Sequence, residues 1–197
     1  MAFSDFTFPQ VLHDLKLELQ SDDFASEIPS ANVDPLLKQF LDRYVPLALS
    51  SNTEKARSEF AIAPILAEVK RLAEVEIALF SGVAFDVDRD RGLSGILDFA
   101  LAKTSNPYVL SAPILVVVAK NDNLASGLGE VISAMRAADF SNRISNITTT
   151  VYGLCTTGTE WRFMKCNSKV VTLNCYDFYI DNVGKILGVL QHVVRSS

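Results

Sequence analysis

The sequence predicts one α/β domain with a mixed central β-sheet flanked by helices. Its 197 residues are enough to bury a sizeable core, and 49% hydrophobic with 21% charged residues is a globular composition. Apolar residues recur at helical spacing in the first third, and short strand-like segments then alternate with helices. The predicted order is α-α-α-β-β-β-α-β-β-β-α, with residues 1–50 as an N-terminal helical segment and residues 51–197 as the α/β part of a single domain 1–197.

Three helices are predicted in the first third of the chain. The first spans 9–20, with Pro9 near its start, and the second spans 35–49, with Asp34 as its N-cap and Pro35 in its first turn. The third spans 53–78, behind a Ser51-Asn52-Thr53-Glu54 stretch that matches a capping box.

Strand patterns follow. Residues 76–87 and 95–102 form a hairpin around a glycine-containing turn, and the continuous apolar run 113–119 is typical of a central strand covered on both faces. The remaining predicted elements are a helix at 127–140, a strand at 147–157, a β-meander over 161–166 and 169–178, and a helix at 181–194 with Val183, Ile186, Leu187, Leu190 and Val194 inward.

Composition limits the cellular compartment and the kinds of partner that we expect for this protein. No apolar run approaches the roughly 20 residues of a membrane span, and the first residues lack the features of a signal peptide. The three cysteines, Cys155, Cys166 and Cys175, have no CxxC spacing, so we expect small core residues in a reducing compartment and a cytoplasmic protein. A net charge of −5 argues against strong nonspecific binding to nucleic acid, although residues 101–197 carry 9 bases against 6 acids.

Several site patterns are absent or weak. With two histidines near opposite ends of the chain, a histidine-rich metal cluster or a Ser-His-Asp triad is not expected. Walker A, G-x-G-x-x-G and G-x-S-x-G patterns do not occur. The alternating acids of Asp86-Val87-Asp88-Arg89-Asp90-Arg91 are interleaved with arginines, which favours a solvated turn over a cation site.

One set of residues has the order of a known site. Glu59 lies on the third helix, Asp98 ends the hairpin-strand sequence Gly95-Ile96-Leu97-Asp98, and Lys120 ends the buried strand. An amphipathic helix follows, and Val151–Cys166 reads VYGLCTTGTEWRFMKC. From Thr53 to Cys175 the chain resembles the PD-(D/E)xK, or restriction-endonuclease-like, superfamily. It is similar to cyanobacterial members and to the N-terminal nuclease domain of type I restriction subunits.

The resemblance implies a metal-dependent phosphodiester hydrolase with a nuclease-like core over 51–197. Asp98 matches the metal-binding Asp, the carbonyl of Ala119 matches the middle of the acid-x-Lys motif, and Lys120 matches the catalytic lysine. Glu59 matches the helix acid, as an outer ligand or an orienting group. Such a site holds a hard cation, usually Mg²⁺, through oxygen ligands, and the lysine stabilises charge developing on the phosphate.

The chain departs from the motif at one position. Val118 occupies the acid position, and valine cannot bind a cation. Glu130 on the following helix is the first candidate replacement, which would make Asp98, Ala119 and Glu130 the metal ligands. Asp122 is a second candidate, and the third interpretation is a fold that has lost catalysis.

Each residue also has a structural interpretation. Asp98 could pair with Lys120 without a metal, Glu130 could be an acid favoured by a helix N-terminus, and Glu59 could face solvent. Aromatic residues Tyr152, Trp161 and Phe163 fit a core better than a base-stacking surface. Both a phosphate-contacting role and a solvated strand face fit Arg162 and Lys165.

Two functions therefore stay open. The first is a nuclease-like protein acting on phosphodiester bonds of nucleic acid, with a degenerate or migrated acid. The alternative is a catalytically inactive nuclease-fold protein that serves as a binding or assembly subunit. In the second case the apolar C-terminal helix would suit a homodimer or a protein partner, although packing on the sheet is the simpler role for it.

Overall fold

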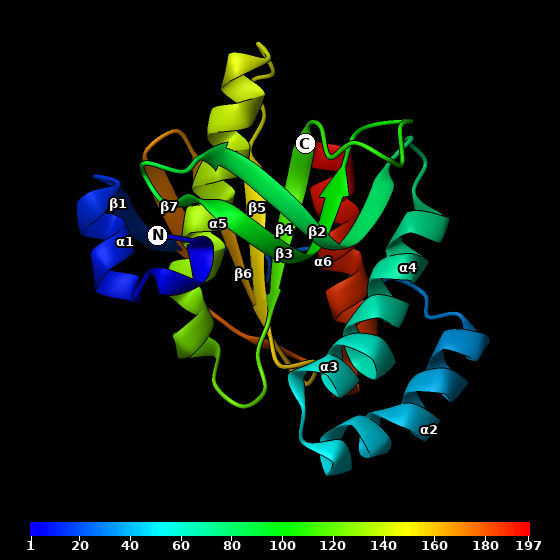
Figure 1. Cartoon of the computed structure of the whole chain (residues 1–197). Coiled ribbons are helices and arrows are strands. Elements are labelled where there is room, and N and C mark those ends of the chain that lie inside the picture. The colour runs from blue at the N-terminus through cyan, green and yellow to red at the C-terminus, as the bar shows by residue number, and fades with distance from the viewer.

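A mixed β-sheet of eight strands forms the middle layer of the structure, a computed structural model that describes residues 1–197 (Figure 1). The strand order is β1-β7-β6-β5-β4-β3-β2, and β8 pairs with β6. The β4–β5 and β1–β7 pairs are parallel, and the other pairs are antiparallel. The strands are β1 (Glu18–Asp22), β2 (Ala78–Asp88), β3 (Leu93–Ala102), β4 (Pro113–Ala119), β5 (Val151–Thr156), β6 (Glu160–Asn167), β7 (Val170–Asn174) and β8 (Phe178–Tyr179).

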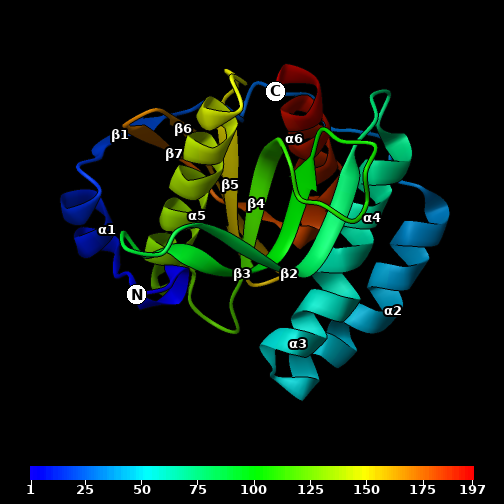
Figure 2. The same ribbon diagram turned by 45° about the horizontal axis from the view of Figure 1, so that its top comes forward.

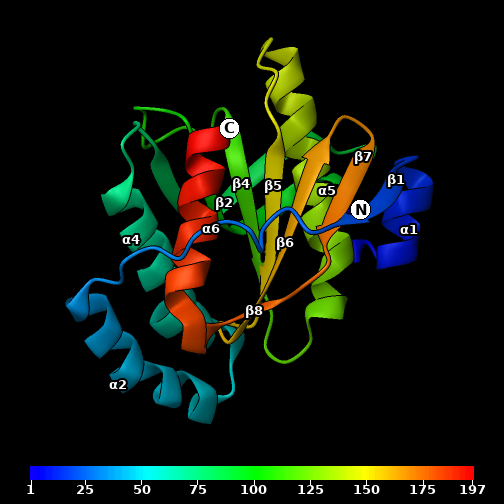
Figure 3. The same ribbon diagram turned by 180° about the vertical axis from the view of Figure 1, so that it is seen from behind.

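Helices cover both faces of this sheet, as predicted. The helix α5 and the N-terminal segment lie on one face, and α4 and α6 lie on the other, as the front and back views show (Figures 1 and 3). The α-helices are α1 (Phe8–Asp14), α2 (Pro35–Ser51), α3 (Glu54–Arg57), α4 (Ala63–Leu72), α5 (Leu124–Ile144) and α6 (Val183–Ser196). Three short helical segments complete the chain: η1 (Phe3–Asp5), η2 (Ser58–Ile62) and η3 (Ile180–Asn182).

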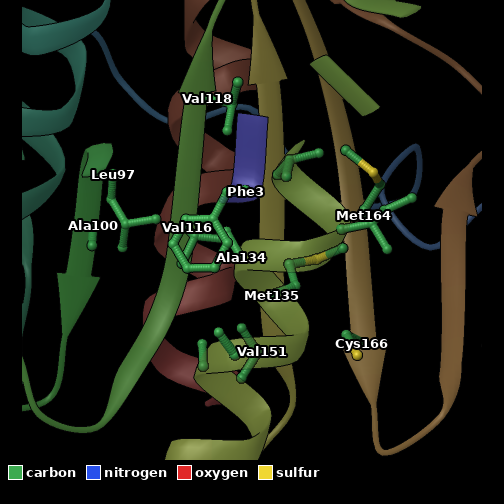
Figure 4. Packing of buried hydrophobic residues seen from close by; sticks show 14 of the residues in the cluster. Phe3, Leu97, Ala100, Val116, Val118, Ala134, Met135, Val151, Met164 and Cys166 are labelled. Atoms are coloured by element: carbon green, nitrogen blue, oxygen red, sulfur yellow. The ribbon is translucent and has the colours of Figure 1, made fainter. Parts of the chain in front are cut away.

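The central strand β4 divides the core into two apolar layers. Every residue of β4 is buried, as the continuous apolar run predicts. Val116 and Val118 pack on the α5 side beside Phe3 (Figure 4), whereas Leu115 and Val117 pack toward α6. Burying one such side chain contributes about 1.5–3 kcal/mol, so β4 is a rigid base for whatever its last residue carries.

The N-terminal segment differs from the prediction. The expected helix 9–20 ends at Asp14, and Glu18–Asp22 form β1 at the edge of the sheet. Lys16 adopts a left-handed conformation, with φ of 52°, between them. The helical pattern fails there because all five residues of β1 are exposed, so the pairing with β7, not an apolar face, makes them a strand.

The third predicted helix is also modified. It runs from Glu54 to Leu72, with a π-helical turn, η2, between α3 and α4. Ser51 belongs to α2 and does not begin a capping box; the hydroxyl of Thr53 accepts a hydrogen bond from the N–H of Ala56 at 3.2 Å instead.

Other predictions have mixed outcomes. Cys155 and Cys166 are buried, but the prediction of a core position for Cys175 is wrong, because it follows the end of β7 and is exposed. The β2–β3 turn is a solvated, ion-paired turn as expected, with Arg89 bound to Asp86 and Arg91 near Asp88. No helix has the length and apolar character needed to span a bilayer.

Candidate functional site

Asp98 lies where the β3–β4 ladder stops. The last paired residues are Phe99 and Val117, and beyond them the carboxylate of Asp98 replaces the backbone partner. Its Oδ2 accepts a hydrogen bond from the N–H of Ala119 at 2.8 Å. The two predicted ligand residues Asp98 and Ala119 are therefore adjacent, and one carboxylate oxygen of Asp98 is occupied by β4.

A bend in the hairpin opens the other side of Asp98. Gly82 stands opposite Asp98, between the pairs Ser81–Phe99 and Val83–Leu97, and its φ of +62° is a conformation that glycine favours. The β2–β3 hairpin curves across the sheet (Figure 2). A pocket of about 290 Å³, lined by Asp98, Gly82 and residues of α3 and η2, lies at the bend.

Lys120 and Glu130 form the second half of the site. The N–H of Lys120 donates to the carbonyl of Thr156 on β5, at 2.8 Å, which fixes the end of β4. Its Nζ lies 2.7 Å from Oε2 of Glu130, and the two side chains are 19% and 17% exposed. Glu130 is not in the first turn of its helix, because α5 begins at Leu124 and not near Gly127, so the helix-terminus interpretation does not apply.

Gly127 makes room for this pair. A Cβ at this position would lie 3.0 Å from Cγ of Lys120 and 2.6 Å from Sγ of Cys155. The stem of Lys120 thus passes over the backbone of α5, which directs the ammonium to Glu130 one turn further along. A larger residue at position 127 would clash with Cys155 and crowd the stem of Lys120.

The charges in the site shift one another's pKa values. Burial is the main cause that raises the pKa of Asp98 above its ordinary value; the Ala119 N–H opposes the shift, and the charge of Glu130 adds to it. Burial lowers the pKa of Lys120, but the hydrogen bond and charge of Glu130 outweigh it, so the net shift is upward. Lys120 is therefore a cation at neutral pH and not a general base.

Glu54 joins this group, which the sequence did not predict. Partial desolvation is the largest cause that raises its pKa; the charge of Lys120 opposes the shift, and those of Asp98 and Glu130 add to it. It lines the same pocket as Asp98. The only sequence signal was an acid in the first helical turn, and that pattern is equally typical of ordinary capping.

Glu59 is less central than the family motif implies. It lines the pocket beside Asp98, but its carboxylate pairs with Lys55 one turn earlier, at 2.9 Å, and is 52% exposed. Its position fits an outer group or a solvent-facing residue, the two alternatives that the sequence left open.

The remaining candidates separate clearly. Asp122 is exposed and forms no ion pair, so it does not join the cluster. Val118 is 2% exposed and lies among the apolar side chains that face α5 (Figure 4). A charged acid at this position would be buried among them, whereas Glu130 brings a carboxylate to Lys120 from the helix.

Hydrogen bonds from Arg57 connect α3 to the loops beside the site. The side chain of Arg57 donates to Oδ1 of Asn121 at 3.2 Å and to the carbonyl of Thr157 at 3.0 Å. The β4–α5 loop therefore lies beside α3 (Figure 1), and no carboxylate neutralises Arg57 within 4.0 Å.

The carboxylate oxygens of Asp98 and Glu130 are the type of ligand that Mg²⁺ prefers. No three His, Cys, Asp or Glu side chains are placed to hold one metal ion together. Mg²⁺, however, is usually bound through one or two carboxylates and keeps several waters. Asp98 and Glu130 supply that number, provided that Glu130 releases Lys120.

Other candidate contacts are satisfied within the protein. Trp161, Phe163 and Tyr152 are buried in the core, as predicted. Arg162 forms a two-bond pair with Asp177, at 2.7 and 2.6 Å, and Lys165 lies over the ring of Phe24. Neither basic residue is positioned as a free phosphate contact.

Comparison with protein-family models, with curated proteins and with solved structures found no match to this chain in any of the three. The interpretation of the site therefore depends on its own geometry.

Proposed function

We propose that this chain is a nuclease-like protein of the PD-(D/E)xK superfamily that acts on phosphodiester bonds of nucleic acid. One observation carries the proposal: Asp98, Lys120 and Glu130 meet at the end of β4 from three different segments, and the charge of Glu130 raises the pKa values of both Asp98 and Lys120. The order helix, hairpin, buried strand and crossover helix to a parallel strand supports it as well.

Each residue has a role in this proposal. Asp98 and Glu130, with the Ala119 carbonyl, would hold a hydrated Mg²⁺ ion, which supplies Lewis-acid polarisation of the phosphate and an activated water. Lys120, held as a cation, stabilises negative charge that develops on the phosphate oxygens. Glu54, whose pKa is raised, is positioned to accept a proton at the pocket.

A second candidate function is a nuclease-fold protein without catalysis, which binds a partner. The closed Lys120–Glu130 pair favours it, because each charge there already neutralises the other at 2.7 Å. The two candidates differ in whether a metal ion can draw Glu130 from Lys120.

Titration calorimetry with Mg²⁺ and with Mn²⁺ separates them. The wild type is compared with Asp98→Asn and Glu130→Gln, which keep the shape of each side chain, and with Asp122→Asn as a control outside the cluster. The proposal expects binding that both site variants lose and that the control retains. Lys120→Gln should still bind metal but lose cleavage of single- and double-stranded DNA and RNA.

The opposite result is equally clear. If millimolar metal does not bind to the wild type and no substrate is cleaved, the catalytic proposal is wrong and the second candidate stands. Equal metal affinity in Asp98→Asn and the wild type would place any bound ion outside this site.

A further inference from the structure

A second pocket, of about 600 Å³, shares no lining residue with the pocket beside Asp98. The N-terminal segment, the β2–β3 turn, α5 and the β6–β7 turn enclose it, and Figures 1 and 2 show the first three of these side by side. It is lined in part by Phe6, Leu15, Lys16, Arg91, Arg136 and Lys169. Its volume lies within the roughly 300–1,000 Å³ that is typical of small-molecule sites.

One wall of this second pocket is apolar and firmly fixed. Phe6 and Leu93 are buried, and Leu15 is half-buried. Gly92, with φ of +74°, lets the ring of Phe6 and the side chain of Met1 approach the turn, because a Cβ there would lie 3.0 Å from each. The wall is therefore built by close packing of two distant chain segments.

The other wall is cationic. Lys16, Arg91, Arg136 and Lys169 come from four separate elements. Lys16 and Lys169 have no carboxylate within 4.0 Å, and Arg91 is 3.5 Å from Asp88. Four basic side chains thus line one cavity in a protein whose net charge is −5, and two of them, Lys16 and Lys169, have no acidic partner.

Two of these cations lie over the same aromatic ring. The guanidinium carbons of Arg91 and Arg136 are 6.0 and 5.9 Å from the centre of the same ring, that of Phe140. Arg136 shares its carboxylate partner, Asp139, with Arg143, so the acid does not neutralise both.

The acids at the pocket do not cancel this charge. Only Asp14 and Asp90 line it. Asp14 is bound to His13 at 2.8 Å, and Asp90 is exposed on the turn. Four cations against two acids leave the lining positive.

We propose that this pocket binds an organic phosphate of nucleotide size, with phosphate groups on Lys16, Arg91 and Lys169 and an aromatic base on the wall of Phe6 and Leu15. Charge-assisted hydrogen bonds from arginine and lysine are the usual recognition of phosphate, and aromatic rings pack well on apolar walls. The inference is independent of the proposed nuclease function, because the two sites share no residue.

Calorimetry with ATP, adenosine and inorganic pyrophosphate, in metal-free buffer, tests it. Arg91→Ala and the double variant Lys16→Ala/Lys169→Ala remove exposed cations and should fold normally. Arg89→Ala is the matched control, since it lies on the same turn, is 78% exposed and does not line the pocket. We expect ATP to bind more tightly than either fragment, and each pocket variant to weaken it by roughly tenfold or more.

Three outcomes would overturn the proposal. The first is no binding of ATP at millimolar concentration. Equal weakening by Arg89→Ala and Arg91→Ala would indicate diffuse surface charge. Pyrophosphate binding as tightly as ATP would show that the apolar wall takes no part.

Discussion

At the scale of single residues, Asp98 both ends a β-ladder and carries charge. It replaces the backbone partner of Ala119, yet its pKa is raised, chiefly by burial. A carboxyl group with a raised pKa in the folded state binds its proton more tightly there than in the unfolded chain. Its ionisation therefore opposes folding, which is typical of sites kept for function.

This predicts a pH-dependent gain in stability for Asp98→Asn. Between the unfolded pKa, about 3.9, and the higher folded pKa, the native wild type holds more protons than the unfolded chain. Its stability therefore falls as pH rises through that window, and the variant lacks this loss. Thermal unfolding followed by circular dichroism from about pH 4 to about pH 7.5 should show no gain at the acid end and a growing gain above it.

Asp98→Ala is the control for this prediction. Alanine removes the acceptor for the N–H of Ala119, so the variant should lose about 1–3 kcal/mol at the acid end of the range. This loss should shrink as pH rises, because alanine also lacks the ionisation that destabilises the wild type. A gain for Asp98→Asn that is largest at acid pH would contradict the assigned direction of the pKa shift.

The part of the site that the sequence could predict is the part fixed by the alternation of side chains along a β-strand. The spacing of two places Lys120 on the same face of β4 as Val118, next to the crossover helix that carries Glu130. The rotation of α3 against the sheet depends on tertiary packing and the π-helical turn, which no local pattern encodes. That is why Glu54 was missed and why the sequence left the role of Glu59 open between an outer group and a solvent-facing residue.

At the scale of elements, the spacing of apolar residues predicted the helices and strands that bury one face or both. The strand 113–119 has the predicted bounds, and α2, α6 and the β2–β3 hairpin lie within a few residues of prediction. β1 was missed because an exposed edge strand has no apolar face to reveal it. Its state is determined by the hydrogen bonds of β7, which lies about 150 residues away in the sequence.

The loop between β1 and α2 offers a test at this scale. It crosses α6 (Figure 3), and a Cβ on Gly188 would lie 2.1 Å from the carbonyl oxygen of Pro29. Gly188→Ala must move this backbone, so we expect faster chymotryptic cleavage after Phe24, the aromatic residue of segment 23–34, and a lower melting temperature. His192→Ala, an exposed change on the same helix, should alter neither. An unchanged cleavage pattern in Gly188→Ala would contradict the contact.

At the scale of the whole molecule, the N-terminal segment ties distant elements together. Phe3, Phe6, Val11 and Leu17 are buried in the layer that faces α5. The backbone of Phe6 lies so close to α5 that a Cβ on Gly129 would meet its carbonyl oxygen at 2.1 Å. β1 then closes the edge of the sheet beside β7. The segment is therefore a part of the core and of the sheet, and it also forms one wall of the second pocket.

Removal of residues 1–22 should consequently disrupt the whole fold. The deletion leaves the β7 edge unpaired and uncovers the apolar face of α5, and both changes favour association between chains. We expect the shortened protein to bind the dye ANS and to elute as aggregates in size-exclusion chromatography. Phe3→Ala, a milder change at a side chain 1% exposed, should stay monomeric and lose about 3–5 kcal/mol. A monomeric deletion variant with a cooperative unfolding transition would contradict this, because residues 23–197 would then form a complete core by themselves.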